Sequence, residues 1–231
     1  MTKPSFRFIG RGVYSPHEAS RLTGVPTQRI RRWANGYQFK YRGQRRLSPP
    51  IIAAQLHGEL GILTLDFADL LEIRFLDAFL ERGVSWKTIR IASERARELL
   101  HTTHPFSSKR FVTDGHTVLA NFASEMGDRV LLDLVRNQYE VERLIADCLF
   151  GEIDFDEGDT PSRWWPLPGS RRIVIDPQRA FGAPIVDEEG VQTAVLASAV
   201  AAEDSIELVS AIYDVDPISV ADAVSYEHSR S

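Results

Sequence analysis

The chain has 231 residues, of which 43% are hydrophobic and 26% charged, and a formal net charge of −5 at pH 7. These values are ordinary for a globular protein with a buried core, and the length suggests two domains, or two and a connector. The sequence has no apolar run long enough for a membrane span and no secretory leader. Cys148 is its single cysteine, so an internal disulfide is excluded. We therefore expect a cytoplasmic protein.

Charge is divided unevenly along the chain. The first 50 residues contain eleven Lys or Arg and one acid, Glu18, which gives them a formal charge of +10, whereas residues 51–231 have −15. A surface that is merely solvated usually mixes both signs. An asymmetry of this size indicates a polyanionic partner for the N-terminal segment.

Residues 13–36 have the pattern of two short helices joined by a tight turn. The first begins with a capping box, Ser15-Pro16-His17-Glu18, and ends at Gly24. The second begins at Pro26-Thr27 and ends at Asn35-Gly36. This pattern predicts a helix-turn-helix, a motif whose second helix fits the major groove of DNA.

The second helix and the segment after it contain most of the basic residues. Ile30 and Trp33 are spaced to pack inward, which leaves the arginines outside, where a guanidinium can bond guanine or phosphate. Residues 37–50 alternate aromatic and polar side chains around Gly43 and predict a hairpin that reaches the neighbouring DNA backbone. We expect DNA contacts from Thr27, Gln28, Arg29, Arg31 and Arg32 of the helix, and Lys40, Arg42, Arg45 and Arg46 of the hairpin.

Two longer helices are expected next. The first runs from Phe67 to Gly83, and Ser85 caps the second, whose apolar face carries Trp86, Ile89, Ala96 and Leu99. A second apolar side on the first helix implies burial on both faces, either inside the protomer or at a dimer contact. That second side consists of Ile73, Leu76 and Leu80.

The rest of the chain shows mixed patterns. Asp114-Gly115 predicts a hairpin between residues 110–112 and 117–122, and a helix is expected over 135–149. Residues 151–170 have the composition of an acidic, then Pro- and Trp-rich, connector. Further on, β-like runs at 172–176 and 181–186 precede helices that start at Asp204-Ser205 and Asp216-Pro217. Residues 201–231 contain seven acids and one base, so we expect them to contact protein and not DNA.

These elements predict a mainly helical α+β fold. We expect a winged helix-turn-helix with accessory helices over residues 1–102, a central mixed α/β segment with its connector over 103–170, and a small helical domain with a short β element over 171–231. The spacing of His101, His104 and His116 does not match a zinc site, and the acids of 154–159 do not match a calcium loop. The three histidines are expected at the surface, and we expect no enzymatic activity, metal or cofactor.

Two resemblances extend these inferences. Gly12 to Gly36, GVYSPHEASRLTGVPTQRIRRWANG, resembles the start of MerR-like regulators, and Thr64 to Arg90 resembles the helices that follow the wing in that family. Residues 172–193, RIVIDPQRAFGAPIVDEEGVQT, and the tail DPISVADAVSYE resemble the small domain common to VapB-type antitoxins. Those antitoxins inhibit a PIN-domain ribonuclease toxin, and the pair represses its own promoter. The resemblance implies an antitoxin that is a homodimer and binds operator double-stranded DNA and a PIN-domain toxin.

Side chains for the toxin contact are not selected by the sequence. Trp164 and Trp165 could anchor a partner, because tryptophan is favoured at interfaces, or pack inside the protein. Antitoxins of PIN-domain toxins often place a basic side chain in the toxin's acidic site, for which Arg163, Arg171 and Arg172 are the candidates that the resemblance implies. The alternative function is a stand-alone MerR-like transcriptional regulator that responds to a small effector, which an apolar pocket would favour.

Overall fold

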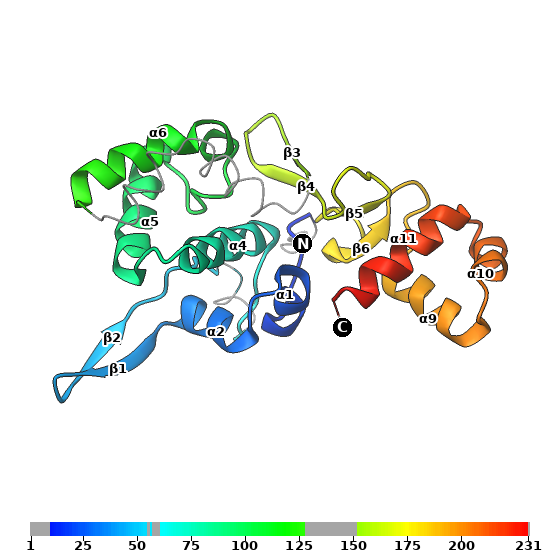
Figure 1. Cartoon of the computed structure of the whole chain (residues 1–231), viewed down its shortest axis with the longest axis horizontal. Helices are drawn as coiled ribbons and strands as arrows, with labels where there is room; N and C mark the ends of the chain where they lie inside the picture. The colour runs from blue at the N-terminus through cyan, green and yellow to red at the C-terminus, as the bar shows by residue number, and fades with distance from the viewer. Residues whose placement is uncertain (1–9, 55, 57–60, 128–151, 231) are drawn as a thin grey trace, which may run out of the picture. The chain divides into compact units, whose positions relative to one another are not determined.

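The computed structural model describes residues 10–54, 56, 61–127 and 152–230 (Figure 1). The chain divides into two compact units. The helical unit comprises Tyr14–Leu149 and Phe155–Pro161, and the sheet unit comprises Met1–Val13, Phe150–Asp154 and Ser162–Ser231. None of the helices formed by the described residues is long and apolar enough to cross a membrane.

The helical unit begins with the predicted pair of short helices, α1 (Pro16–Thr23) and α2 (Thr27–Asn35). The capping box is present: the Ser15 hydroxyl accepts from the Glu18 amide at 3.2 Å, and the Glu18 carboxylate accepts from the Ser15 amide at 2.8 Å. Gly24 caps the end of α1 in the left-handed conformation. The predicted helix boundaries are therefore confirmed.

A hairpin of β1 (Tyr37–Tyr41) and β2 (Gln44–Ser48) follows, with its turn at Arg42-Gly43 as predicted. Gly36 lies between α2 and β1 with φ +71° and ψ 176°, a conformation open almost only to glycine. A Cβ atom there would lie 2.5 Å from the Ser48 carbonyl oxygen. Because Gly36 has no side chain, the backbone that leaves α2 can pass close to Ser48 at the end of β2.

Helix α4 (Phe67–Glu81) is the centre of the helical unit, between the α1–α2 pair and the helices α5 (Trp86–Leu100) and α6 (Lys109–Met126) (Figure 1). Ile73 and Leu76, on its second apolar side, are fully buried within the chain. Burial inside the protomer is therefore the alternative observed for these two residues, whereas Leu80, the third residue of that side, is half-buried. On α5, Leu99 is 44% exposed, although we expected it on the packed face.

The hairpin predicted at Asp114-Gly115 is wrong, because these residues lie inside α6. The Ser108 hydroxyl caps this helix by accepting from the Phe111 amide at 3.2 Å, and Gly127 ends it in the left-handed conformation. The buried Phe111 also packs edge-on against Phe75 of α4, with ring centroids 5.6 Å apart. Tertiary packing thus overrides the local turn propensity. The helix predicted over 135–149 lies outside the described residues.

The sheet unit contains a four-stranded sheet in the order β3-β4-β5-β6. The stretch expected as a connector instead supplies two strands, whose turn is held by the Asp156 carboxylate accepting from the Gly158 and Thr160 amides, both at 2.9 Å. The β run predicted at 172–176 is confirmed, whereas of 181–186 only the second half is a strand, because Ala180–Gly182 form a short 3-10 helix. The strands are β3 (Glu152–Phe155), β4 (Pro161–Trp165), β5 (Ile173–Ile175) and β6 (Pro184–Val186).

Three helices complete this unit, α9 (Thr193–Glu203), α10 (Ile206–Tyr213) and α11 (Pro217–His228). The predicted starts are confirmed: the Ser205 hydroxyl accepts from the Leu208 amide at 3.1 Å, and the Asp216 carboxylate accepts from the Ser219 amide at 3.0 Å. Strands and helices share one core. Its buried members are Ile173, Val186, Leu196, Val209, Val215, Val220, Ala223 and Tyr226.

The close approach at Gly36 gives a first prediction. An alanine at a positive φ costs about 1–2 kcal/mol, and at Gly36 its methyl group would also collide with the Ser48 carbonyl, which adds roughly 1–3 kcal/mol. Gly24 is the control, because its φ is also positive (+78°), its ψ of −4° lies in the left-handed region that other residues can adopt, and a methyl group added there would meet nothing within 4 Å. We expect Gly36→Ala to lower the free energy of unfolding, measured in urea, by more than Gly24→Ala. Equal losses would contradict the steric argument.

Candidate nucleic-acid interface

Helix α2 and the hairpin form one stretch, residues 27–48, with seven basic residues and no acidic one. Gln28 is exposed and Thr27 is half-buried at the start of the helix. We call the exposed cations of this stretch the basic surface: Arg29, Arg31 and Arg32 on α2, and Lys40, Arg42, Arg45 and Arg46 on the hairpin. All nine residues predicted from the sequence therefore lie on two consecutive elements.

The inner side of α2 is fixed by Trp33. Its indole stacks on Trp86 of α5, with ring centroids 5.8 Å apart and an interplanar angle of 12°. Its carbonyl oxygen accepts from the amides of Ile51 and Ile52, at 2.8 and 3.2 Å. Helix α2 is thus attached both to α5 and to the segment that returns from the hairpin, and its outer side is left to the cations.

The base of the hairpin is fixed by Arg90 of α5. The Arg90 guanidinium donates to the Ser48 hydroxyl at 3.0 Å and to the carbonyls of Pro49 and Pro50 at 2.8 and 3.3 Å. It also lies over the Trp86 ring, 5.5 Å from the centroid. Partial burial lowers the pKa of Arg90 from its ordinary value, since desolvation disfavours the charged form. One α5 side chain therefore holds the strand that returns from the hairpin tip.

The two faces of the hairpin differ in character. Side chains alternate along a strand, so the register that pairs Phe39 with Arg46 and Lys40 with Arg45 puts Tyr41, Phe39 and Arg46 on one face and Lys40 and Arg45 on the other. Arg46 lies over the Tyr41 ring at 4.9 Å, a cation–π contact that restrains the guanidinium. Both faces therefore present positive charge.

Arg29 differs from the other cations of α2, because it forms an ion pair with Asp77 of α4. The Arg29 side chain is 43% exposed and that of Asp77 16%. Arg31 and Arg32 are exposed, and Arg32 lies over the Tyr37 ring at 5.6 Å. The charge of Arg29 is thus offset within the protein, and the ion pair attaches α2 to the central helix.

Three supports of this surface, Asp77, Trp86 and Arg90, were not predicted from the sequence. Each acts on a partner far away in the chain, and nothing in the local pattern marks such a pairing. The only available indication was the four-residue spacing of Trp86 and Arg90, which puts them on one side of α5.

The five candidates for a toxin contact all lie in the sheet unit. Trp164 is fully buried and Trp165 nearly so, with the Trp165 indole N–H donating to the Asp154 carboxylate at 2.9 Å. Their burial favours packing, one of the two alternatives left open by the sequence. The arginines are half-exposed and each has a carboxylate partner: Arg163 with Asp176 at 3.3 Å, Arg171 with Asp154 at 2.9 Å, and Arg172 with Asp222 at 3.4 Å.

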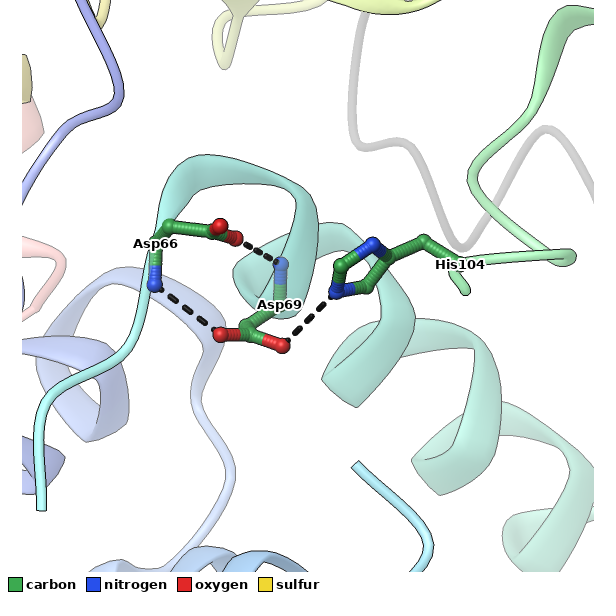
Figure 2. Close-up of side chains that lie close together, drawn as sticks. All are labelled: Asp66, Asp69 and His104. Atoms are coloured by element: carbon green, nitrogen blue, oxygen red, sulfur yellow. Dashed lines mark hydrogen bonds and ion pairs between the residues drawn. The ribbon is translucent and has the colours of Figure 1, made fainter. Parts of the chain in front are cut away.

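A buried polar cluster lies at the start of α4 (Figure 2). Asp66 and Asp69 form a reciprocal cap, in which each carboxylate accepts from the other's amide at 3.0 Å. The Asp69 carboxylate also accepts from the Ala54 amide at 3.3 Å and pairs with His104 Nε2 at 2.9 Å. His104 was expected at the surface, and this expectation is wrong: the residues that follow α5 fold back against α4.

The cluster could in principle hold a metal ion, since one ligand atom from each of Asp66, Asp69 and His104 lies within 4.8 Å of the others. However, the carboxylates of both aspartates already accept the backbone amides that begin α4. Coordination of an ion would draw them away from this cap and weaken the helix start, which typically costs about 1 kcal/mol per cap. The geometry therefore fits a helix cap joined to a buried ion pair.

Glu72 lies one turn after Asp69 and is also buried. Its carboxylate accepts from the amides of Phe106 and Ser107 at 3.1 and 3.2 Å, and so fastens that segment to α4. Burial raises the pKa of Glu72 to about 7 and also raises the pKa of Asp69. Desolvation lowers the pKa of His104, but the hydrogen bond and charge of Asp69 outweigh it, so the net pKa of His104 is raised.

Comparison with known proteins bears on both units. Residues 12–93 match a protein family described as "Putative DNA-binding HTH domain". The chain is 29% identical over 221 residues to the "Putative antitoxin VapB45" of Mycobacterium tuberculosis strain H37Rv, with 92% of each protein covered. The crystal structure of Rv2018 from Mycobacterium tuberculosis is 28% identical, with a TM-score of 0.71, and the match covers 91% of this chain and 96% of that one. The predicted N-terminal helix-turn-helix and the mixed α+β architecture are thereby supported.

The raised pKa of Glu72 predicts a pH dependence of stability. A carboxyl group whose pKa is higher in the folded state binds its proton more tightly there, so the free energy of unfolding falls as the pH rises from 4.5, the ordinary value, to about 7. Glu72→Gln keeps an acceptor for both amides but removes this titration. We expect wild type to lose on the order of 3 kcal/mol relative to Glu72→Gln over that interval, measured by urea unfolding.

The matched control is Glu98→Gln, because Glu98 is an exposed glutamate on α5. Its pH profile should run parallel to that of wild type. Parallel profiles for wild type and Glu72→Gln would show that the buried carboxyl group does not titrate as described.

Proposed function

We propose that this protein is the antitoxin of a type II toxin–antitoxin pair, which binds operator DNA as an autorepressor and inhibits a PIN-domain ribonuclease toxin. The observation that carries DNA binding is the basic surface, an acid-free stretch of α2 and hairpin within the segment that matches a DNA-binding family. The antitoxin role is supported by similarity over 92% of the length of a protein named as a VapB antitoxin.

In this proposal α2 enters the major groove, as in MerR-like regulators. Thr27 and Gln28 lie at its N-terminal end, where recognition helices approach base edges, and Arg31 and Arg32 reach bases or flanking phosphates. Lys40 and Arg45 on one face of the hairpin, and Arg42 and Arg46 near Tyr41, neutralise the adjacent backbone. Arg29 contributes mainly by positioning α2, because contact with phosphate would compete with its ion pair to Asp77.

Repressors of this architecture bind two-fold operators as dimers with half-sites about one helical turn, or a multiple of it, apart, and we propose a homodimer here. Ile73 and Leu76 of the second apolar side of α4 are buried within the chain and are not available to this contact, whereas Leu80 is half-buried.

For the toxin, a basic side chain that enters an acidic nuclease site would have to exchange one carboxylate partner for another. Three arginines of the sheet unit are suited to this exchange, because each is half-exposed and already paired with an aspartate. They are Arg163, Arg171 and Arg172. The toxin's metal-binding carboxylates would replace Asp176, Asp154 or Asp222. We place Trp164 and Trp165 beneath this surface as its support, because both are buried.

The alternative, a stand-alone regulator with a small effector, would be favoured by an apolar pocket. A pocket of about 550 Å³ does lie between α5 and α6, but its lining mixes Leu99 and Phe122 with polar and charged side chains. The polar members are Arg95, Glu98, Asn121 and Ser124. This lining does not favour the alternative over the antitoxin.

The DNA proposal predicts the effect of removing the exposed α2 arginines. Arg31→Ala with Arg32→Ala should weaken binding to the promoter DNA by roughly 1–3 kcal/mol per base-reading arginine and relax its sequence specificity. The control is Arg95→Ala, an exposed arginine of α5 outside the basic surface. Gel-shift titration at fixed salt provides the measurement. Unchanged affinity in the double variant would show that α2 is not the recognition helix.

The same titration over a range of salt separates the roles of the cations. Arg45→Ala removes a phosphate contact and should lower the slope of log affinity against log salt by about one unit. Arg29→Ala should change this slope by less, because the ion pair with Asp77 already offsets its charge.

The antitoxin proposal predicts growth rescue. Expression of the full chain should relieve the growth arrest caused by the product of the neighbouring toxin gene, and the Arg31→Ala, Arg32→Ala variant should rescue equally well, because its altered side chains serve DNA. A chain that binds promoter DNA but neither rescues growth nor copurifies with the neighbouring product would overturn the antitoxin role in favour of the stand-alone regulator.

A further inference from the structure

Helix α10 of the sheet unit is apolar on two sides and covered on one. Glu207 is its only charged residue. Val209 is fully buried in the core formed with α9, α11 and the sheet. On the outer side, Leu208 is 45% and Ile212 60% exposed, and Ala211 is also exposed. Positions 208, 211 and 212 lie on one stripe of the helix, which we call the α10 face.

The fold itself does not account for this stripe. A helix with two apolar sides is normally buried on both, as α4 is in the helical unit. Single exposed apolar residues are common and need no explanation, but a group of them marks an interaction site. Further exposed apolar side chains are Tyr213, the last residue of α10, which is 36% exposed, and Ile218 in the first turn of α11, which is 56% exposed.

Negative charge surrounds the α10 face. Exposed acids occur at both ends of the helix and on it, at Asp204, Glu207, Asp214 and Asp216. More broadly, residues 181–229 contain ten acidic residues and no Lys or Arg. Any partner that covers Leu208 and Ile212 must therefore bring its own surface close to several uncompensated carboxylates.

The negative charge around the α10 face restricts which kind of partner can bind there. In a two-fold contact between copies of this chain, each acidic rim would face another, which is unfavourable. DNA is excluded for the same reason, because its phosphates are repelled. The surface that fits is an apolar patch rimmed by Lys or Arg. A ribonuclease has such a rim for a physical reason, since it must attract a polyanionic substrate.

We propose that the α10 face is a docking surface for a basic partner protein, and that this partner is the toxin. The identity of the partner rests on the function proposed above, and this contact adds to the one proposed there for an arginine of the sheet unit. Leu208 and Ile212 lose water on contact and supply the apolar centre of the interface. The surrounding carboxylates speed association and select against acidic partners, as complementary charges do at protein interfaces. The basic surface of the helical unit is left to the operator.

The test compares variants of the full chain for binding to the product of the neighbouring toxin gene. Leu208→Ser with Ile212→Ser should weaken binding about ten- to a hundredfold, since apolar anchors dominate such contacts. Glu207→Lys with Asp214→Lys should slow association and reduce its acceleration at low salt. Val195→Ser is the matched control, an apolar residue of α9 that is 40% exposed and outside the α10 face, and should bind like wild type.

Each variant should bind promoter DNA like wild type, which shows that the chain is folded. Toxin binding unaffected by Leu208→Ser with Ile212→Ser would overturn the proposal while leaving the antitoxin role intact. A dimer that falls apart in the same variant, seen by light scattering, would assign the α10 face to a second copy and would also overturn it. Failure of wild type to bind the toxin would defeat the antitoxin role itself, and this inference with it.

Discussion

The arrangement of the helical unit depends on the burial of α4 on both of its apolar sides. Helix α1 packs on α4, α2 is attached to it by the Arg29–Asp77 ion pair, and the Phe75 and Phe79 rings of α4 contact Phe111 and Phe106 from the segment around the start of α6. Polar side chains of the same helix set the positions of what packs on it: Asp77 holds Arg29 of α2, Asp69 holds His104, and Glu72 holds the chain after it. Packing and polar contacts of one buried helix therefore set where the elements attached to it present their outer surfaces.

The two proposed functions, DNA binding and toxin binding, belong to parts of the chain with opposite charge. The cations of α2 and the hairpin have no acidic residue among them, and the helices of the sheet unit have almost no cation among their acids. Since electrostatics dominates the affinity of proteins for nucleic acid, only the first surface suits DNA. The second repels phosphate and other copies of itself, and its uncovered apolar helix suits a basic protein. An antitoxin that also represses its own promoter needs one surface for DNA and a different one for the toxin, because the two ligands would otherwise compete.

Local features were predictable from the sequence where the physical cause is local. The capping box at Ser15, the turn at Gly43 and the helix starts at Ser205 and Asp216 depend on residues within a few positions of each other, and all are present. Predictions failed where distant packing decides the outcome. Asp114-Gly115 favours a turn in isolation but lies in α6, and His104 is spaced like a surface residue but packs against α4. The support of the basic surface by Arg90 could not be predicted for the same reason.

In the function proposed here, a surface of the helical unit binds operator DNA and a surface of the sheet unit binds the toxin. Hydrogen exchange of the full-length protein, measured alone, with promoter DNA and with the copurified toxin, tests it directly. We expect DNA to slow exchange in α2 and in the hairpin from Tyr37 to Ser48, the toxin to slow exchange in and around α10, and the complex of all three to show both effects. Protection of α2 and the hairpin by the toxin, or of α10 by DNA, would contradict it.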